Sequence, residues 1–198
     1  MFSSCSVKLG EVEEESAAPP TLDGVWATSC MADGPGSYVK SIQLEDGVLQ
    51  IATMRFENNT NCEQAFLSTT VVVSGKFAVT GDGFAEDVKN YEWEIEMMVG
   101  IPNTQAMVDD LNASSACGYN TWGAGQPQII LGCNLGTNMD LTNVVYGTKH
   151  YGIYEIQENV TPLYVQFESK CAEAGFGEFC PTEDSRPAEF DGTVFFKQ

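Results

Sequence analysis

The chain has 198 residues and a net charge of −19, from 28 acidic and nine basic residues. This length fits one domain with a substantial core, and no apolar run approaches the ~20 residues that a membrane helix needs. Because so acidic a surface repels phosphate backbones, the charge argues against nucleic-acid partners.

Residues 1–20 are predicted to form a flexible tether, because Glu, Ser, Ala and Pro dominate and few side chains can be buried. Within it, Phe2-Ser3-Ser4-Cys5 resembles the end of a bacterial lipobox, where a signal peptide is removed and the cysteine receives acyl chains. We therefore expect a lipid anchor at Cys5, and membrane contact through that anchor only. The alternative is an incidental cysteine in a disordered N-terminus.

Seven cysteines accompany a single histidine, His150. A structural zinc site needs four closely set thiolate or imidazole ligands, and the chain has no Cys-x-x-Cys pair. We expect disulfides instead, which indicate an oxidising compartment, and we expect no metal and no cofactor. Cys5 is the cysteine left over. Near neighbours are the favoured partners, although crossed connectivities stay open: Cys30 with Cys62, Cys117 with Cys133, and Cys171 with Cys180.

Residues 21–198 are predicted to be one domain built mainly of β-strands. Turn signals such as Asp23-Gly24 and Glu45-Asp46-Gly47 separate short strand-like segments, and Ser74-Gly75 indicates a bulge or a tight turn within the segment 66–79. The expected strands are 24–30, 37–44, 48–56, 66–79, 91–97, 128–131, 148–157, 161–167 and 193–197.

The segment 91–97 has the clearest strand pattern, because apolar and aromatic residues alternate with three glutamates. One face should be buried and the other, carrying Glu92, Glu94 and Glu96, should be wet. The segment 104–115 is the one helix expected, with Asn103 as its N-cap.

Many short strands with one helix predict a mostly antiparallel sheet, and closure into a barrel removes its edges. Gly24-Val25-Trp26 is similar to the G-x-W motif of lipocalins and the wider calycin group, and Arg186 falls where those barrels place an arginine against that tryptophan. The resemblance implies an all-β, lipocalin-like closed barrel of about eight strands with disulfide-pinned loops. It also implies that Arg186 packs on Trp26 and joins the first strand to the last.

The chain also resembles envelope lipoproteins that carry a lipidated cysteine, an acidic linker and a G-x-W start. The resemblance implies a lipid-anchored protein of the outer membrane or periplasm that binds a small hydrophobic or amphipathic ligand inside the barrel. A fully packed interior is the alternative. The side chains expected to line the interior are Tyr91, Trp93, Ile95, Met97, Tyr151, Ile153, Leu163 and Val165.

Two other functions are considered. A non-enzymatic adhesion or protein-interaction module would use the barrel as a scaffold and bind a protein partner through the loops 117–140 and 168–185, with Trp122 or Phe176 exposed. A hydrolase would need His150 or an acid pair from the glutamate-rich strand, and no G-x-S-x-G elbow accompanies the histidine. We do not predict an enzyme.

Overall fold

The structure is a computed structural model that describes residues 21–133, 144–157, 160–167 and 180–198. In these ranges it has ten strands and one α-helix, α1 (Gln105–Ala113), besides three short 3-10 helices at Gln64–Phe66, Ala116–Gly118 and Glu183–Ser185. The strands are β1 (Gly24–Ala27), β2 (Met31–Asp33), β3 (Gly36–Glu45), β4 (Val48–Phe56), β5 (Leu67–Asp82), β6 (Val88–Pro102), β7 (Gln128–Ile129), β8 (Lys149–Gln157), β9 (Tyr164–Phe167) and β10 (Val194–Lys197).

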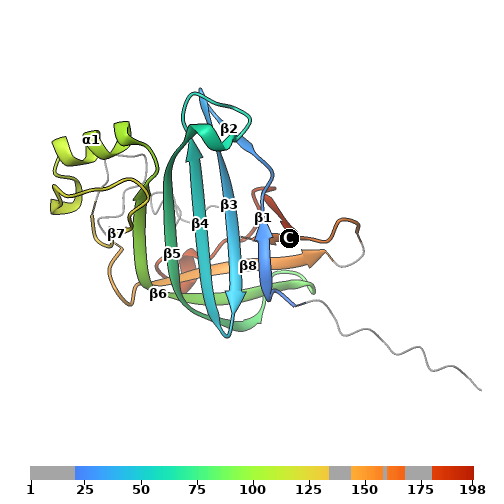
Figure 1. The fold of residues 1–198 in the computed structure, drawn as a ribbon. Coiled ribbons are helices and arrows are strands. Elements are labelled where there is room, and N and C mark those ends of the chain that lie inside the picture. The colour runs from blue at the N-terminus through green and yellow to red at the C-terminus, as the bar shows by residue number, and fades with distance from the viewer. Residues whose placement is uncertain (1–20, 134–143, 158–159, 168–179) are drawn as a thin grey trace, which may run out of the picture.

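Eight of the strands form a closed antiparallel barrel (Figure 1). The order around the barrel is β1-β10-β9-β8-β6-β5-β4-β3, and β3 pairs with β1 to complete the ring. In β1, Trp26 lies opposite Lys197 of β10 on one side and opposite Ile42 of β3 on the other. The predicted fold class is therefore confirmed. β2 extends along β3, and β7 pairs with β6 outside the ring.

The strands β5 and β6 are long enough to curve around the barrel because their pairing is interrupted twice. One register shift lies between Ser74 and Gly75, as predicted, and the other between Val79 and Gly81. At Gly75 a Cβ atom would collide with the carbonyl oxygen of Glu94, so only glycine fits this bulge.

The half of the barrel near the β3–β4 turn is filled by aromatic side chains. Trp26 and Tyr91 are completely buried. Tyr91 stacks on Phe167 with 5.0 Å between the ring centroids, and it packs on Phe77 at 5.1 Å. Gly152 lies opposite Tyr91, where a Cβ would collide with the tyrosine ring. This half of the interior is a solid core.

The cation over Trp26 is Lys197 and not Arg186, so the predicted Trp26–Arg186 contact is wrong. Lys197 lies opposite Trp26 in the β1–β10 register, with its Nζ 5.1 Å from the ring centroid. The indole Nε1 of Trp26 donates to the carbonyl oxygen of Leu22 at 2.8 Å. The guanidinium of Arg186 is bonded elsewhere, to the carbonyl oxygens of Tyr91 and Gly152.

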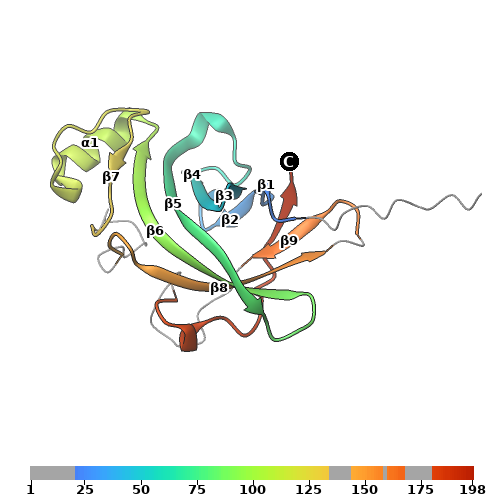
Figure 2. The ribbon, with the colours of Figure 1, turned by 90° about the horizontal axis from the view of Figure 1, so that it is seen from below.

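Arg186 instead fixes the segment 180–190 to the barrel. Its Nη1 lies 2.7 Å from the carbonyl oxygens of both Tyr91 and Gly152, and its guanidinium lies 5.4 Å from the ring centroid of Tyr151. The carbonyl of Cys180 accepts the N–H of Tyr151 at 3.0 Å. Figure 2 shows this C-terminal segment beside β8, on the side away from β3 and β4.

Two predicted disulfides are confirmed, Cys30–Cys62 and Cys117–Cys133. Cys180 is disulfide-bonded, and its predicted partner Cys171 lies outside the described residues, as do Cys5 and the tether 1–20.

The helix is confirmed, but the predicted cap is wrong. Thr104 is the N-cap, and its side chain accepts the N–H of Met107 at 3.2 Å. Asn103 instead donates to the hydroxyl of Thr70 at 3.0 Å.

Among the described residues, no helix is long and apolar enough to cross a membrane. The sequence also gave no signal for β2, whose three residues follow a disulfide cysteine.

Replacing Arg186 with Met should lower the free energy of unfolding by about 2–4 kcal/mol, because two charged hydrogen bonds at a largely buried guanidinium are lost. Replacing Lys197 with Met should cost only about 0.5–1 kcal/mol, since its cation–π contact is exposed. Urea unfolding of both variants measures the difference. A larger loss at Lys197 than at Arg186 would contradict these assignments.

Candidate ligand site at the barrel mouth

We call the end of the barrel where β3 begins and β4 ends the mouth; it is the upper end in Figure 1. Near the middle of the barrel, Ile42 lies opposite Ile51, and Ile42 is buried in the core. Two residues closer to the mouth, Lys40 lies opposite Thr53. Because strand side chains alternate between faces, Lys40 and Thr53 share the inner face with the two isoleucines.

The inner face becomes polar and basic toward the mouth. After Lys40 and Thr53 comes the pair Tyr38 and Arg55, and Thr69 of β5 lies opposite Arg55. Thr53 and Thr69 are 8% and 6% exposed, while Lys40, Tyr38 and Arg55 are half-buried. Together with Thr28, these six residues are called the mouth set.

Two bonds position basic residues of the mouth set. The hydroxyl of Thr28 accepts the backbone N–H of Lys40 at 3.0 Å, which joins the chain after β1 to β3. Arg55 Nη1 pairs with Asp33 Oδ2 of β2 at 3.1 Å, and both side chains are partly exposed. The mouth therefore carries hydroxyl groups and cations above an apolar interior.

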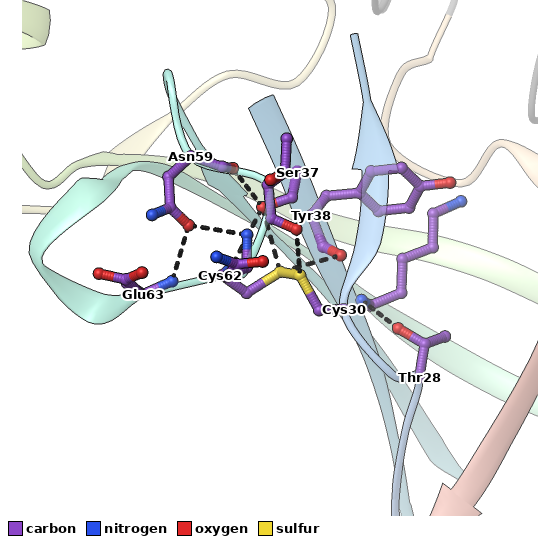
Figure 3. Close-up of a disulfide and its surroundings, with 10 residues drawn as sticks. Thr28, Cys30, Ser37, Tyr38, Asn59, Cys62 and Glu63 are labelled. Atoms are coloured by element: carbon purple, nitrogen blue, oxygen red, sulfur yellow. Dashed lines mark hydrogen bonds between the residues drawn. A yellow bond between two sulfur atoms is a disulfide. The ribbon is translucent and has the colours of Figure 1, made fainter. Parts of the chain in front are cut away.

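The disulfide Cys30–Cys62 holds the loop after β4 against the outer side of the mouth (Figure 3). Ser37, on the outer face of β3, donates to the carbonyl of Asn59 at 2.7 Å and accepts the N–H of Cys62 at 3.2 Å. Figure 3 shows Tyr38 pointing away from Ser37 and from this loop. The picture agrees with the strand alternation, which places Tyr38 on the inner face.

The Asn59 side chain shapes the same loop, since its Oδ1 accepts the backbone N–H groups of Asn61 and Glu63 at 3.0 and 3.1 Å. Asn58 and Cys62 have left-handed backbone conformations, with φ of 52° and 54°. The loop is thus fixed by its own side chains as well as by the disulfide.

A small hollow lies where α1 meets the ends of β5 and β6. Its volume of about 10 Å³ is near the space that one water needs, so it is too small for a ligand. Trp122 is buried there, because Asn112 bonds both its N–H and its carbonyl. An exposed Trp122 would have favoured the interaction module, and the buried Trp122 does not; Phe176 lies outside the described residues. The hollow is lined by Thr69, Gly100, Ile101, Pro102, Met107, Leu111 and Trp122.

The residues predicted to line the interior are divided between two faces. Tyr91, Trp93, Ile95 and Val165 are buried in the core, and Leu163 packs against it partly buried. These five lie within the solid part of the barrel.

The inward placement of Met97, Tyr151 and Ile153 is wrong. The register shift next to Met97 brings Met98 into the core, leaving Met97 44% exposed. Tyr151 and Ile153 lie opposite Glu92 and Asn90, on the outer face of the sheet, where Ile153 is nevertheless buried at 1% exposed. The sequence alone does not show how β6 pairs with β8, so it could not show which face of the sheet carries Tyr151 and Ile153.

His150 is 1% exposed and lies within the packed interior. Its Nδ1 accepts the backbone N–H of Cys180 at 2.8 Å, and its ring lies 5.9 Å from Tyr91 and 6.1 Å from Trp93. An acceptor Nδ1 carries no proton, so in a neutral ring the proton is on Nε2.

The glutamates of β6 form an outward ladder of ion pairs. Glu92 bonds Lys149 at 2.8 Å, and Glu96 bonds Lys76 at 2.8 Å. These partners raise the pKa of both lysines, first through the hydrogen bond and then through charge, and the Glu94 charge adds to both. The acids are thus matched by lysines of the two neighbouring strands.

Sequence reasoning missed the mouth set, although a signal was present. Lys40 is two residues from Ile42 and four from Leu44, so strict alternation in 37–44 already assigns it to the apolar face. Arg55 is likewise two residues from Thr53 and four from Ile51, so alternation in 48–56 places all three on one face. The barrel supplies the further fact that this face points inward.

No protein-family model and no curated protein matches this sequence.

Another ion pair gives a pH-dependent test. Lys89 Nζ bonds Asp82 Oδ1 at 2.6 Å and lowers the pKa of Asp82, first through the hydrogen bond and then through charge. A carboxyl whose pKa is lowered on folding contributes stability above its unfolded pKa and loses it as the pH falls through the folded value. Replacing Lys89 with Gln should raise the pKa of Asp82 toward 3.8, measured by NMR titration of the carboxyl carbon. An unchanged pKa would contradict the pairing.

Proposed function

We propose that this protein is a lipid-anchored envelope protein whose barrel binds a small amphipathic ligand at its mouth. The observation that carries the proposal is the change along the inner faces of β3 and β4, from buried apolar side chains to hydroxyl and basic ones. A ligand with an apolar part and a polar head matches this change from apolar to polar side chains along the inner face.

The placement of basic residues supports ligand binding over a purely structural barrel. Turning charged side chains inward costs solvation, and a barrel that serves only as a scaffold can be filled with apolar residues. Among the described residues, Lys40 and Arg55 lie on the inner face toward the mouth. Tyr38 and Ile51 are half-buried beside them and offer apolar surface to a ligand.

The cellular setting is proposed on chemistry and resemblance. The disulfides suit an oxidising compartment such as the periplasm or cell surface. The lipocalin-like identity rests on the closed barrel and the Gly24-Val25-Trp26 motif, and the envelope location also rests on the lipobox-like segment at Cys5.

The anchor predicts that the mature protein isolated from membranes begins at an acylated Cys5. Mass spectrometry of its N-terminal peptide should show the added acyl chains, and a Cys5→Ser variant should leave the membrane fraction. An unmodified peptide that includes residues 1–4 would contradict the anchor.

A protein-interaction module is the second candidate, and two observations favour it. The aromatic half of the barrel is solid, as a scaffold would be. On the outer side of β6, exposed apolar side chains gather where β7 and residues 145–146 adjoin it, in the part of the chain near the loop 117–140. They are Met97, Ile129, Val145 and Tyr146.

Calorimetric titration with single-chain amphiphiles below their micellar concentration tests the ligand proposal. We expect saturable binding of one ligand per protein for at least one amphiphile. A Tyr38→Ala variant should weaken it about tenfold, because Tyr38 faces the mouth. Val39→Ala is the matched control, since Val39 is equally half-buried but faces outward. If anionic, neutral and cationic amphiphiles all fail to bind the wild-type protein, the ligand proposal is wrong.

A further inference from the structure

We infer that the outer face of β4, β5, β6 and β7 is a docking surface for a short segment of a partner protein that carries both apolar and basic side chains. The inference does not depend on a ligand at the mouth. It gives the second candidate function, a protein-interaction module, a defined surface and a kind of partner.

Apolar side chains form a row across these four strands, three of which, β4, β5 and β6, Figure 1 shows in this order. The register aligns Ala52 with Val72 and Val72 with Val99. On β7, Ile129 continues the row opposite Val99 and is 60% exposed. The row faces outward, because Val73, next to Val72, is buried in the core.

More exposed apolar side chains adjoin this row on the side away from the mouth. In β6, Met97 is 44% exposed. The turn at residues 145–148 lies beside it, because Gly147 donates to the carbonyl of Ile95 at 2.8 Å. We call the combined surface the outer patch; it consists of Ala52, Val72, Met97, Val99, Ile129, Val145 and Tyr146.

The outer patch has no charged residue, although 19% of the residues in this chain are charged. Charge begins at its border, where Lys76 lies opposite Glu94 and Glu94 lies opposite Lys149. Lys76 bonds Glu96 and Lys149 bonds Glu92, so in the described part of the chain Glu94 bonds neither lysine that lies opposite it. A basic side chain of a partner can therefore pair with Glu94 without breaking an existing bond.

The charge around the outer patch favours a basic partner over a second copy of this chain. At its border, three glutamates and two lysines leave one negative charge. The whole chain carries −19, so two copies repel each other while a basic segment is attracted during the encounter. Complementary charge at the rim and apolar contact at the centre are the usual division of a protein interface.

The extent of the outer patch fits a short segment better than a second globular surface. Two rows of same-face residues on four strands, with strands ~4.8 Å apart and rows ~6.8 Å apart, cover roughly 250–300 Å². A standard stable interface uses about 800 Å² on each partner, whereas an apolar patch of a few hundred Å² on a monomer is often functional. Met97 and Tyr146 also belong to the residue types that are enriched in interfaces.

Selection of random peptides displayed on phage tests the inference on the wild-type protein. Passage over an unrelated protein of similar net charge first removes peptides that bind any acidic surface. We expect the enriched peptides to combine aromatic or aliphatic residues with Lys or Arg.

Fluorescence anisotropy of a selected peptide assigns the binding to residues. Ile129→Ser and Tyr146→Ser should each weaken binding about tenfold, because exposed apolar anchors are lost. Phe84→Ser is the matched control, since Phe84 is 58% exposed but lies before the start of β6, far along that strand from Met97. Glu94→Gln should weaken binding about threefold, as expected for one exposed ion pair, and the exposed Glu45→Gln should not.

Three results would overturn the inference: no enriched peptide, enriched peptides without Lys or Arg, or equal binding to the wild-type protein and the Ile129→Ser and Tyr146→Ser variants. Sedimentation velocity should show a monomer, and a dimer that Ile129→Ser dissociates would assign the outer patch to a second copy instead. Thermal unfolding confirms that the compared variants are folded.

The ligand proposal succeeds or fails separately. A wild-type protein that binds no amphiphile but binds basic peptides at the outer patch would overturn the ligand proposal and support this inference. Amphiphile binding that persists in Tyr146→Ser, with no peptide selected, would do the reverse.

Discussion

The double pairing of β1 is the constraint on which the rest of the structure depends. This strand has four residues, and it bonds β3 on one side and β10 on the other. Trp26 occupies the centre of this seam, completely buried, with its indole N–H bonded to Leu22 and Lys197 over its ring. Without β1, β3 and β10 would become open edges of a curved sheet.

Closure turns the two faces of the sheet into an inside and an outside. The alternation of side chains along each strand then determines which charged residues face outward and which face inward. The glutamates of β6 fall outside, where Lys76 and Lys149 of the neighbouring strands pair with two of them. Lys40 and Arg55 fall inside, toward the mouth of the barrel. The proposed ligand site is a consequence of this division.

Local features of the sequence predicted much of the fold. Turn signals and alternation predicted the strands of the ring, Ser74-Gly75 predicted the bulge, and spacing predicted the disulfides Cys30–Cys62 and Cys117–Cys133. These features depend on residues near one another in the chain, on disulfides between cysteines close in sequence, or on backbone conformations that few residues tolerate.

The wrong placements of Arg186, Tyr151 and Ile153 depend on the register between strands that are distant in sequence. Arg186 was assigned to Trp26 by position alone, but the pairing of β1 with β10 gives that place to Lys197. Tyr151 and Ile153 were wrongly predicted to face inward, because the face they occupy follows from the β6–β8 register, which no local pattern specifies. Lys40 could have been found, since its face follows from alternation within one strand.

Cross-strand nuclear Overhauser effects around Trp26 test the closed barrel most directly. The account predicts backbone contacts from Trp26 to both Ile42 and Lys197 in the same folded protein. Contacts to only one of the two residues would show an open sheet, and the division into an inner and an outer face would then be lost.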